Sequence, residues 1–159
     1  MLSVVYVRDK TFMTDNELTH ERMQSQTGLS YAEREGGRLS QLTYQIRGAI
    51  FEVYNTLGPG LLESVYEEAL VFELQQQGLQ VARQMEVPIS YKGNCLKTAL
   101  RLDLLIENRI IVELKSVEEM KPVFAKQLLT YLRLLDKRIG LLVNFSSNNI
   151  REGIIRIAN

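Results

Sequence analysis

Apolar residues recur at helical spacing in two successive stretches of the chain. The first stretch begins at Gln41 and ends at the turn Leu57-Gly58-Pro59-Gly60. The second continues from this turn to Gly78, a residue type that commonly caps the C-terminal end of a helix. We therefore predict two consecutive helices, each with one apolar face. The apolar positions are Leu42, Ile46, Ala49, Ile50 and Val53 in the first helix and Leu62, Val65, Tyr66, Ala69, Leu70 and Leu74 in the second.

After Gly78 the spacing changes to a period of two, which is typical of strands. Pro88 cannot donate a ladder hydrogen bond, so we expect its strand at an edge of the sheet or at a bulge. The segment Lys92-Gly93-Asn94 predicts a hairpin turn. The predicted strands are 79–83, 86–91, 95–107 and 110–116.

The last part of the chain alternates between helix and strand. Pro122 suits the first turn of a helix, which we expect to end near Asp136, and residues 139–144 form an apolar strand. The tail from Asn149 fits a helical turn followed by a short strand. The order helix, helix, several strands, helix, strand predicts an α/β domain without internal repeats.

The first forty residues differ from the rest of the chain. Residues 9–37 are polar, have no sustained period and end in the pair Gly36-Gly37, which usually breaks regular structure. We predict a polar N-terminal leader over residues 1–40, flexible or loosely docked, and a single domain over residues 41–159.

The composition is that of an ordinary soluble domain and narrows the available chemistry. The chain has 159 residues, 45% of them hydrophobic, with 19 Lys+Arg and 19 Asp+Glu. A lone Cys95 and a lone His20 leave no set of ligands for zinc or an iron–sulfur cluster. No apolar run approaches the ~20 residues that cross a bilayer, so we expect a cytoplasmic protein without membrane contact. Because the formal charge is zero, nucleic-acid affinity would need a local patch or a metal site.

The strands 101–107 and 110–116 are so close in sequence that they should pair antiparallel. Pairing Ile106 with Ile110 gathers six aliphatic side chains on one face and avoids burying unpaired charge. This register needs a three-residue loop or a bulge at residues 107–109. The six aliphatic residues are Leu102, Leu104, Ile106, Ile110, Val112 and Leu114, and the facing pairs on the other side are Asp103 with Glu113 and Arg101 with Lys115.

Two carboxylates in facing positions repel each other unless positive charge lies between them. A divalent cation would relieve this repulsion, and hard oxygen ligands suit Mg²⁺ or Mn²⁺. Lys115 would then orient or help deprotonate a water, or stabilise negative charge on a phosphate. The alternative is a solvated face on which Arg101 and Lys115 neutralise Asp103 and Glu113. Since Leu105 and Ile111 lie on the same face, we expect it to be partly covered, which favours a site.

The two helices on either side of these strands offer further polar groups. Gln127 and Tyr131 are one turn apart on a mostly apolar stripe and need partners, either a site or the backbone. Glu63 lies in the first turn of its helix, where the helix dipole alone would explain an acidic residue.

The segment Gly60-Leu-Leu-Glu63-Ser-Val-Tyr66 resembles the signature of the GxxExxY protein family, which is placed in the PD-(D/E)XK nuclease superfamily. The resemblance extends from about Leu42 to Ile157. The other matching segments are Leu57-Gly-Pro-Gly-Leu-Leu-Glu63, Tyr91-Lys-Gly93, Arg101-Leu-Asp103, Val112-Glu-Leu-Lys115, Gln127-Leu-Leu-Thr-Tyr131-Leu and Gly140-Leu-Leu-Val-Asn-Phe145.

This resemblance implies a restriction-endonuclease-like core, in which a mixed β-sheet is flanked by α-helices. By the same resemblance, Asp103 and Glu113 are metal ligands and Lys115 is the catalytic lysine. Glu63 resembles the helix-borne acidic residue that also reaches the metal. The pair Gln127 and Tyr131 resembles the Q-x-x-x-Y element of the RecB-like branch, which helps to position the substrate.

We therefore predict a nuclease that hydrolyses DNA with Mg²⁺ or Mn²⁺, with RNA as the other candidate substrate and with a protein partner or a second copy left open. The alternative is a catalytically weak or inactive nuclease-like module that binds nucleic acid or assembles with partners. The absence of global basicity favours this alternative, as do Tyr54 and Phe124, which stand where many family members have histidine. A third hypothesis is a toxin or defence component whose target is supplied by a partner. The predicted catalytic residues are Lys115, Asp103, Glu113, Gln127 and Tyr131, and the predicted metal ligands are Asp103, Glu113 and Glu63.

Overall fold

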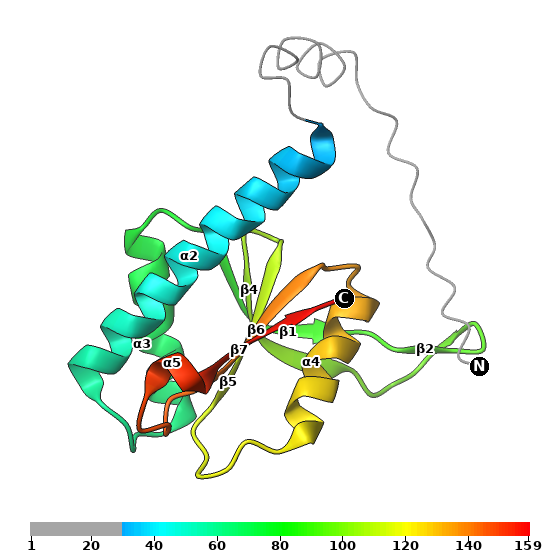
Figure 1. Ribbon diagram of the computed structural model, residues 1–159. Coiled ribbons are helices and arrows are strands. Elements are labelled where there is room, and N and C mark those ends of the chain that lie inside the picture. Colours follow the sequence, from blue (N-terminus) through cyan, green and yellow to red (C-terminus); the bar gives the residue numbers. More distant parts are fainter. Residues whose placement is uncertain (1–29) are drawn as a thin grey trace.

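The central sheet formed by residues 30–159, the part of the chain that the structure describes, has five strands in the order β1-β4-β5-β6-β7. In this computed structural model, β5 and β6 run parallel and the other neighbours run antiparallel (Figure 1). Helices α2 and α3 cover one face and α4 covers the other, which confirms the predicted mixed sheet flanked by helices. The elements are α2 (Tyr31–Leu57), α3 (Glu63–Gln76), β1 (Val81–Val87), β2 (Ser90–Tyr91), β3 (Asn94–Cys95), β4 (Leu100–Ile106), β5 (Ile110–Lys115), α4 (Pro122–Leu134), β6 (Ile139–Asn144), α5 (Ile150–Gly153) and β7 (Ile154–Ala158).

Helix α2 begins ten residues earlier than the apolar pattern predicts. Ser30 and Glu33 form a reciprocal capping box that starts the helix. The helix continues through Gly36 and Gly37 because Glu35 accepts a 3.0 Å hydrogen bond from Arg109 in the β4–β5 turn. Residues 31–40 of the predicted leader therefore belong to α2, and residues 1–29 lie outside the described part of the chain.

The predicted strands 110–116 and 139–144 correspond to β5 and β6, whereas the predicted strand 95–107 is wrong because it divides into β3 and β4. The predicted break between residues 83 and 86 does not end a strand, since β1 runs through it with Gln84 at a φ of 48°. Ser90 pairs with Cys95 and Tyr91 with Asn94 in a separate hairpin, as the turn at Lys92-Gly93-Asn94 predicts. The tail forms the expected helical turn and strand, α5 and β7.

The sheet separates two apolar cores. The larger one lies under α2 and α3, where the rings of Tyr66 and Phe145 stack with their centroids 4.3 Å apart. The smaller one lies under α4 and includes Leu105, Ile111 and Leu128. Both faces of β5 and β6 are thus covered by apolar groups, which explains why nearly all of their residues are buried.

Leu102 packs into the smaller core, not into the larger one as predicted. The β4–β5 ladder pairs Ile106 with Ile110 and ends at Leu104 opposite Val112. Beyond this point β4 remains paired only with β1, where Leu102 lies opposite Met85. The Leu102 side chain therefore does not lie on the same face of the sheet as Leu104 and Ile106, whose positions are fixed by pairing with β5.

Two glycines allow close packing around β6 and provide a test of it. A β-carbon at Gly153 would lie 2.6 Å from the backbone oxygen of Asn144, whereas one at Gly140 would lie 2.7 Å from the end of the Leu128 side chain. We expect Gly153→Ala to lower the free energy of unfolding by about 2–3 kcal/mol and Gly140→Ala by about 1 kcal/mol, because a side chain moves aside more easily than backbone. Urea unfolding followed by circular dichroism measures both, and equal losses would contradict this difference.

Candidate active site

The carboxylates of Asp103 and Glu113 lie where β4 and β5 separate. The backbone N–H of Leu114 donates to Oδ2 of Asp103 at 2.8 Å, and the backbone N–H of Asp103 donates to Oε1 of Glu113 at 3.2 Å. The two carboxylates thus accept backbone N–H groups that backbone carbonyls would accept if the pairing of β4 with β5 continued. The structure thus brings the two predicted acidic residues together, with Glu113 only 2% exposed.

Lys115 brings a third acidic residue into this group. Its Nζ lies 3.7 Å from Oε2 of Glu113, 3.9 Å from Oδ2 of Asp103 and 3.9 Å from Oε1 of Glu63. The same ammonium donates to the carbonyl of Leu114 at 2.6 Å. Three elements, α3, β4 and β5, therefore deliver one carboxylate each to a single, largely buried lysine.

The turn before α3 is fixed by hydrogen bonds that place Glu63. The hydroxyl of Tyr66 donates to the carbonyl of Gly58 at 2.7 Å and accepts from the N–H of Leu61 at 3.0 Å. Ser116 then donates from Oγ to the carbonyl of Leu61 at 2.7 Å, which ties this turn to the end of β5. The Gly-x-x-Glu-x-x-Tyr segment thus has a structural explanation, since its tyrosine holds the loop that leads to its glutamate.

The pKa values of all three carboxylates are raised above their ordinary values. Burial is the largest cause for Glu63, Asp103 and Glu113. For Glu113 the negative charge of Asp103 adds to burial, and the pKa rises to about 8 although Lys115 opposes the shift. One lysine is therefore too little positive charge for three acids in this environment.

The chemistry of this site fits a hard divalent cation, but the site is not assembled around one. Carboxylate oxygens are the ligands that Mg²⁺ and Mn²⁺ prefer, and neutralisation by two positive charges would lower the raised pKa values. Within residues 30–159, however, no three acidic, histidine or cysteine side chains are already grouped at metal-ligand spacing. The ammonium of Lys115 occupies the centre, so Glu63, Asp103 and Glu113 could hold a cation once this side chain moves aside.

Gln127 and Tyr131 lie on α4 and find partners within the protein. Gln127 donates from Nε2 to the hydroxyl of Tyr131 at 2.8 Å, and that hydroxyl donates to the carbonyl of Arg101 at 2.9 Å. Burial is the main reason that the pKa of Tyr131 is raised. The pair connects α4 to β4 two residues before Asp103. Arg101 itself pairs with Glu86 on β1 at 3.4 Å and does not face Lys115 as predicted, because the β4–β5 ladder has ended before it.

Of the two positions at which many family members have histidine, Phe124 lies beside Lys115 and Tyr54 contacts the loop after β6. The ring of Phe124 lies 5.6 Å from Nζ of Lys115, within the range of a cation–π contact. The hydroxyl of Tyr54 donates to the carbonyl of Ser147 at 2.7 Å and holds α2 against the loop after β6. Both aromatic residues support the surroundings of Lys115 without adding a ligand that titrates near neutral pH.

A fourth acid, Glu67, was missed by the sequence analysis. It is 7% exposed and accepts hydrogen bonds from Nε of Arg83 at 2.9 Å and from Nε2 of Gln84. Nε2 of Gln84 also lies 3.5 Å from Oδ1 of Asp103. The signal in the sequence is an acidic residue one helical turn after Glu63, on a face that the apolar pattern buries.

The backbone of β1 is distorted to make these contacts. Consecutive residues of a strand normally point to opposite faces, yet Arg83 and Gln84 both reach the carboxylate of Glu67. The left-handed conformation of Gln84, with φ at 48°, makes this possible at a cost of about 1–3 kcal/mol. Glu67 thus fastens β1 to α3 next to Asp103.

One of the comparisons with known proteins identifies the family of this chain. The chain belongs to the PD-(D/E)XK nuclease superfamily, whose family model matches residues 40–157. Neither the curated proteins nor the solved structures provide a significant match. In the described part of the chain, no helix has the length and apolar character needed to span a bilayer.

The raised pKa of Glu113 predicts a pH dependence of stability in the metal-free protein. A pKa raised from 4.5 to about 8 stabilises the fold fully below pH 4.5, and this contribution is lost as the pH rises towards 8. Relative to Glu113→Gln, the wild type should lose about 2–4 kcal/mol of unfolding free energy between about pH 5 and about pH 9. Chemical unfolding in EDTA at several pH values measures this difference, and parallel curves for the two proteins would contradict it.

The contacts of Glu67 predict a structural role for this buried acid. We expect Glu67→Ala to lower the free energy of unfolding by about 1–3 kcal/mol, because Arg83 and Gln84 lose their partner beside a strained backbone. Glu68→Ala is the matched control on the exposed side of α3 and should change stability by less than about 0.5 kcal/mol. Thermal unfolding of both variants tests the expectation, which fails if Glu67→Ala behaves like the control.

Proposed function

We propose that this chain is a metal-dependent nuclease that hydrolyses phosphodiester bonds of DNA, and that it is a GxxExxY-type member of the RecB-like branch. The observation that supports the proposal best is the convergence of Glu63, Asp103 and Glu113 on Lys115. Membership of the nuclease superfamily supplies the reaction class. Buried acids with raised pKa values next to a lysine are typical of functional sites.

In this proposal Glu63, Asp103 and Glu113 hold Mg²⁺ or Mn²⁺. A divalent cation held there supplies positive charge that offsets the negative charge of the phosphate during attack by water. Displaced from the centre of the three carboxylates, the Lys115 ammonium hydrogen-bonds the attacking water or a non-bridging phosphate oxygen. The new bond forms between water oxygen and phosphorus, and the bond from phosphorus to the leaving oxygen breaks. The attacking water releases a proton to solvent, and the leaving oxygen takes up a proton.

Gln127 and Tyr131 act in this proposal by position. Their hydrogen bonds hold the second half of α4 against Arg101, two residues before Asp103, and the partly exposed Gln127 would face an incoming strand. Glu67 and Gln84 hold the opposite side of Asp103. Contacts from α3 on one side of the sheet and from α4 on the other therefore hold β4 near Asp103 in place when the Lys115 ammonium leaves the three carboxylates.

The first test is cleavage of DNA by the purified full chain with Mg²⁺ or Mn²⁺. We expect Asp103→Ala, Glu113→Ala and Lys115→Ala each to lower the rate by at least roughly 10²–10³-fold, since each removes charge at the reacting phosphate. Lys126→Ala, on the exposed side of α4, is the matched control and should cleave like the wild type. EDTA should abolish cleavage, and an RNA of the same sequence reports the substrate preference. Unchanged cleavage by the three site variants would refute the assignment.

A second candidate function is a nuclease-like module that binds nucleic acid without cutting it. The observation in its favour is the position of Lys115, whose ammonium already neutralises part of the acidic group. Calorimetric titration with Mn²⁺ separates the two functions. The nuclease requires binding that Glu113→Ala weakens by at least about tenfold, whereas no binding at millimolar Mn²⁺ favours the module.

A further inference from the structure

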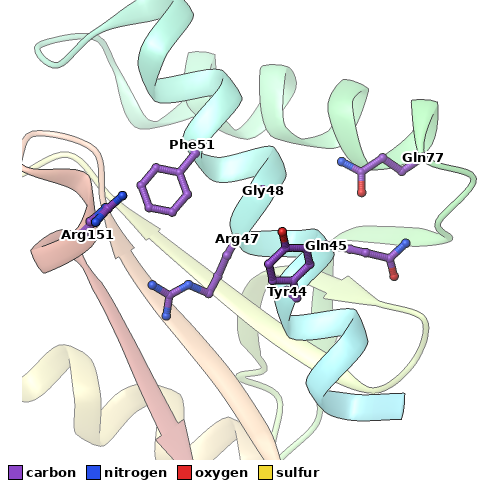
Figure 2. Close-up of a pocket in the computed structure, with 7 residues that line it drawn as sticks. All are labelled: Tyr44, Gln45, Arg47, Gly48, Phe51, Gln77 and Arg151. Atoms are coloured by element: carbon purple, nitrogen blue, oxygen red, sulfur yellow. The ribbon is translucent and has the colours of Figure 1, made fainter. Parts of the chain in front are cut away.

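The outer face of α2 carries a shallow groove that the proposed active site does not use. It has a volume of about 670 Å³ and lies over Gly48, with Tyr44 and Arg47 before it and Phe51 after it on the same helix (Figure 2). These four positions are spaced i, i+3, i+4 and i+7, so they form one stripe of the helix surface. Gln77 at the end of α3 and Arg151 on α5 lie at the two sides of the stripe.

The charge of the groove is positive and unbalanced. Its two charged side chains are Arg47 and Arg151, and no acidic residue lines it. Within residues 30–159 neither guanidinium forms an ion pair with a carboxylate. On a chain whose formal net charge is zero, two guanidinium groups without carboxylate partners in the described structure are a local feature that complements an anion.

The two aromatic side chains of the groove differ in exposure, since Tyr44 is open to solvent and Phe51 is partly buried against the larger core. Tyr44 is 75% exposed, and the guanidinium of Arg151 lies 5.9 Å from the centre of the Phe51 ring. The inner side of α2 buries Ile46, Ala49 and Ile50, so the fold does not need an apolar ring at Tyr44. Exposed ring faces between arginines are the combination that binds unpaired bases and their phosphates.

Gly48 keeps the centre of the groove open. A glycine inside a helix is less favourable than alanine, and a β-carbon at Gly48 would meet no atom within 4 Å. Packing within the described structure therefore does not explain the glycine. The absence of a side chain at Gly48 leaves room for a flat ligand across α2 between Tyr44 and Phe51.

We infer that this groove binds a single-stranded segment of nucleic acid, with bases against Tyr44 and Phe51 and phosphates at Arg47 and Arg151. The inference rests on the proposed function, because it adds a second contact for the same class of substrate. A series of contacts connects the groove with the proposed active site. One turn after Phe51, Tyr54 holds the loop that contains Ser146, and Ser146 hydrogen-bonds Ser116 next to Lys115.

The test measures binding of a fluorescent 20-nucleotide DNA or RNA to the full chain in EDTA, where cleavage does not interfere. We expect the double variant Arg47→Gln/Arg151→Gln to bind single strands at least tenfold more weakly. The slope of log Kd against log salt concentration should also be smaller by about 1.4, which is about 0.7 for each of the two lost phosphate contacts. Arg133→Gln/Arg138→Gln removes the same charge from exposed positions elsewhere and should bind within about twofold of the wild type.

Variants at Gly48 and Tyr44 test the shape of the groove. Gly48→Leu fills it and should weaken binding at least fivefold, whereas Gly48→Ala should raise thermal stability and retain most of the affinity. Tyr44→Phe should bind like the wild type and Tyr44→Ala at least fivefold more weakly, which separates stacking from hydrogen bonding.

Three outcomes would overturn the inference: no binding by the wild type, equal binding by the Arg47/Arg151 and Arg133/Arg138 double variants, or groove variants that change only the capture of a protein or the self-association of the chain. Failure of the proposed function has a different signature. In that case the wild type does not cleave with Mg²⁺ or Mn²⁺, yet binding in EDTA still depends on the groove and is unaffected by Lys115→Ala.

Discussion

The ion group around Lys115 determines how the ends of α3, β4 and β5 meet. Three carboxylates approach one ammonium in a mostly buried space, and the raised pKa values show that one positive charge does not satisfy them. The surrounding contacts oppose this repulsion. Ser116 anchors the turn before α3, Tyr131 anchors α4 to β4, and Glu67 anchors β1 to α3. The free energy gained by burying apolar side chains in the two cores offsets the cost of holding three carboxylates close together.

Much of this arrangement could be predicted from sequence because short-range patterns control it. The spacing of aliphatic residues predicts the Ile106–Ile110 register, which directs Asp103 and Glu113 towards each other, and side-chain hydrogen bonds complete the approach beyond the end of the ladder. The position of Glu63 could not be derived in this way, since it depends on how α3 docks. The resemblance to a nuclease family placed it near the metal, and the structure places it 3.9 Å from Lys115.

The features that were missed depend on long-range contacts or on unusual backbone. Helix α2 continues through Gly36-Gly37 because Arg109 reaches Glu35 across 74 residues. Leu102 and Arg101 depart from the expected faces because the β4–β5 ladder ends at Leu104 opposite Val112, three pairs earlier than the predicted register. The left-handed conformation of Gln84 has no signature in a single sequence, because it accompanies a long-range contact in which Arg83 and Gln84 both donate to the Glu67 carboxylate.

The origin of the acidic residues in three separate elements also has a consequence for the order of folding. The β4–β5 hairpin is local and brings two acids together early, whereas the third arrives only when α3 docks against the sheet. A chain in which α3 has not docked therefore lacks the complete group even when the hairpin has formed. If the group is catalytic, cutting is coupled to the final cooperative step of folding, and immature chains are harmless to the nucleic acid around them.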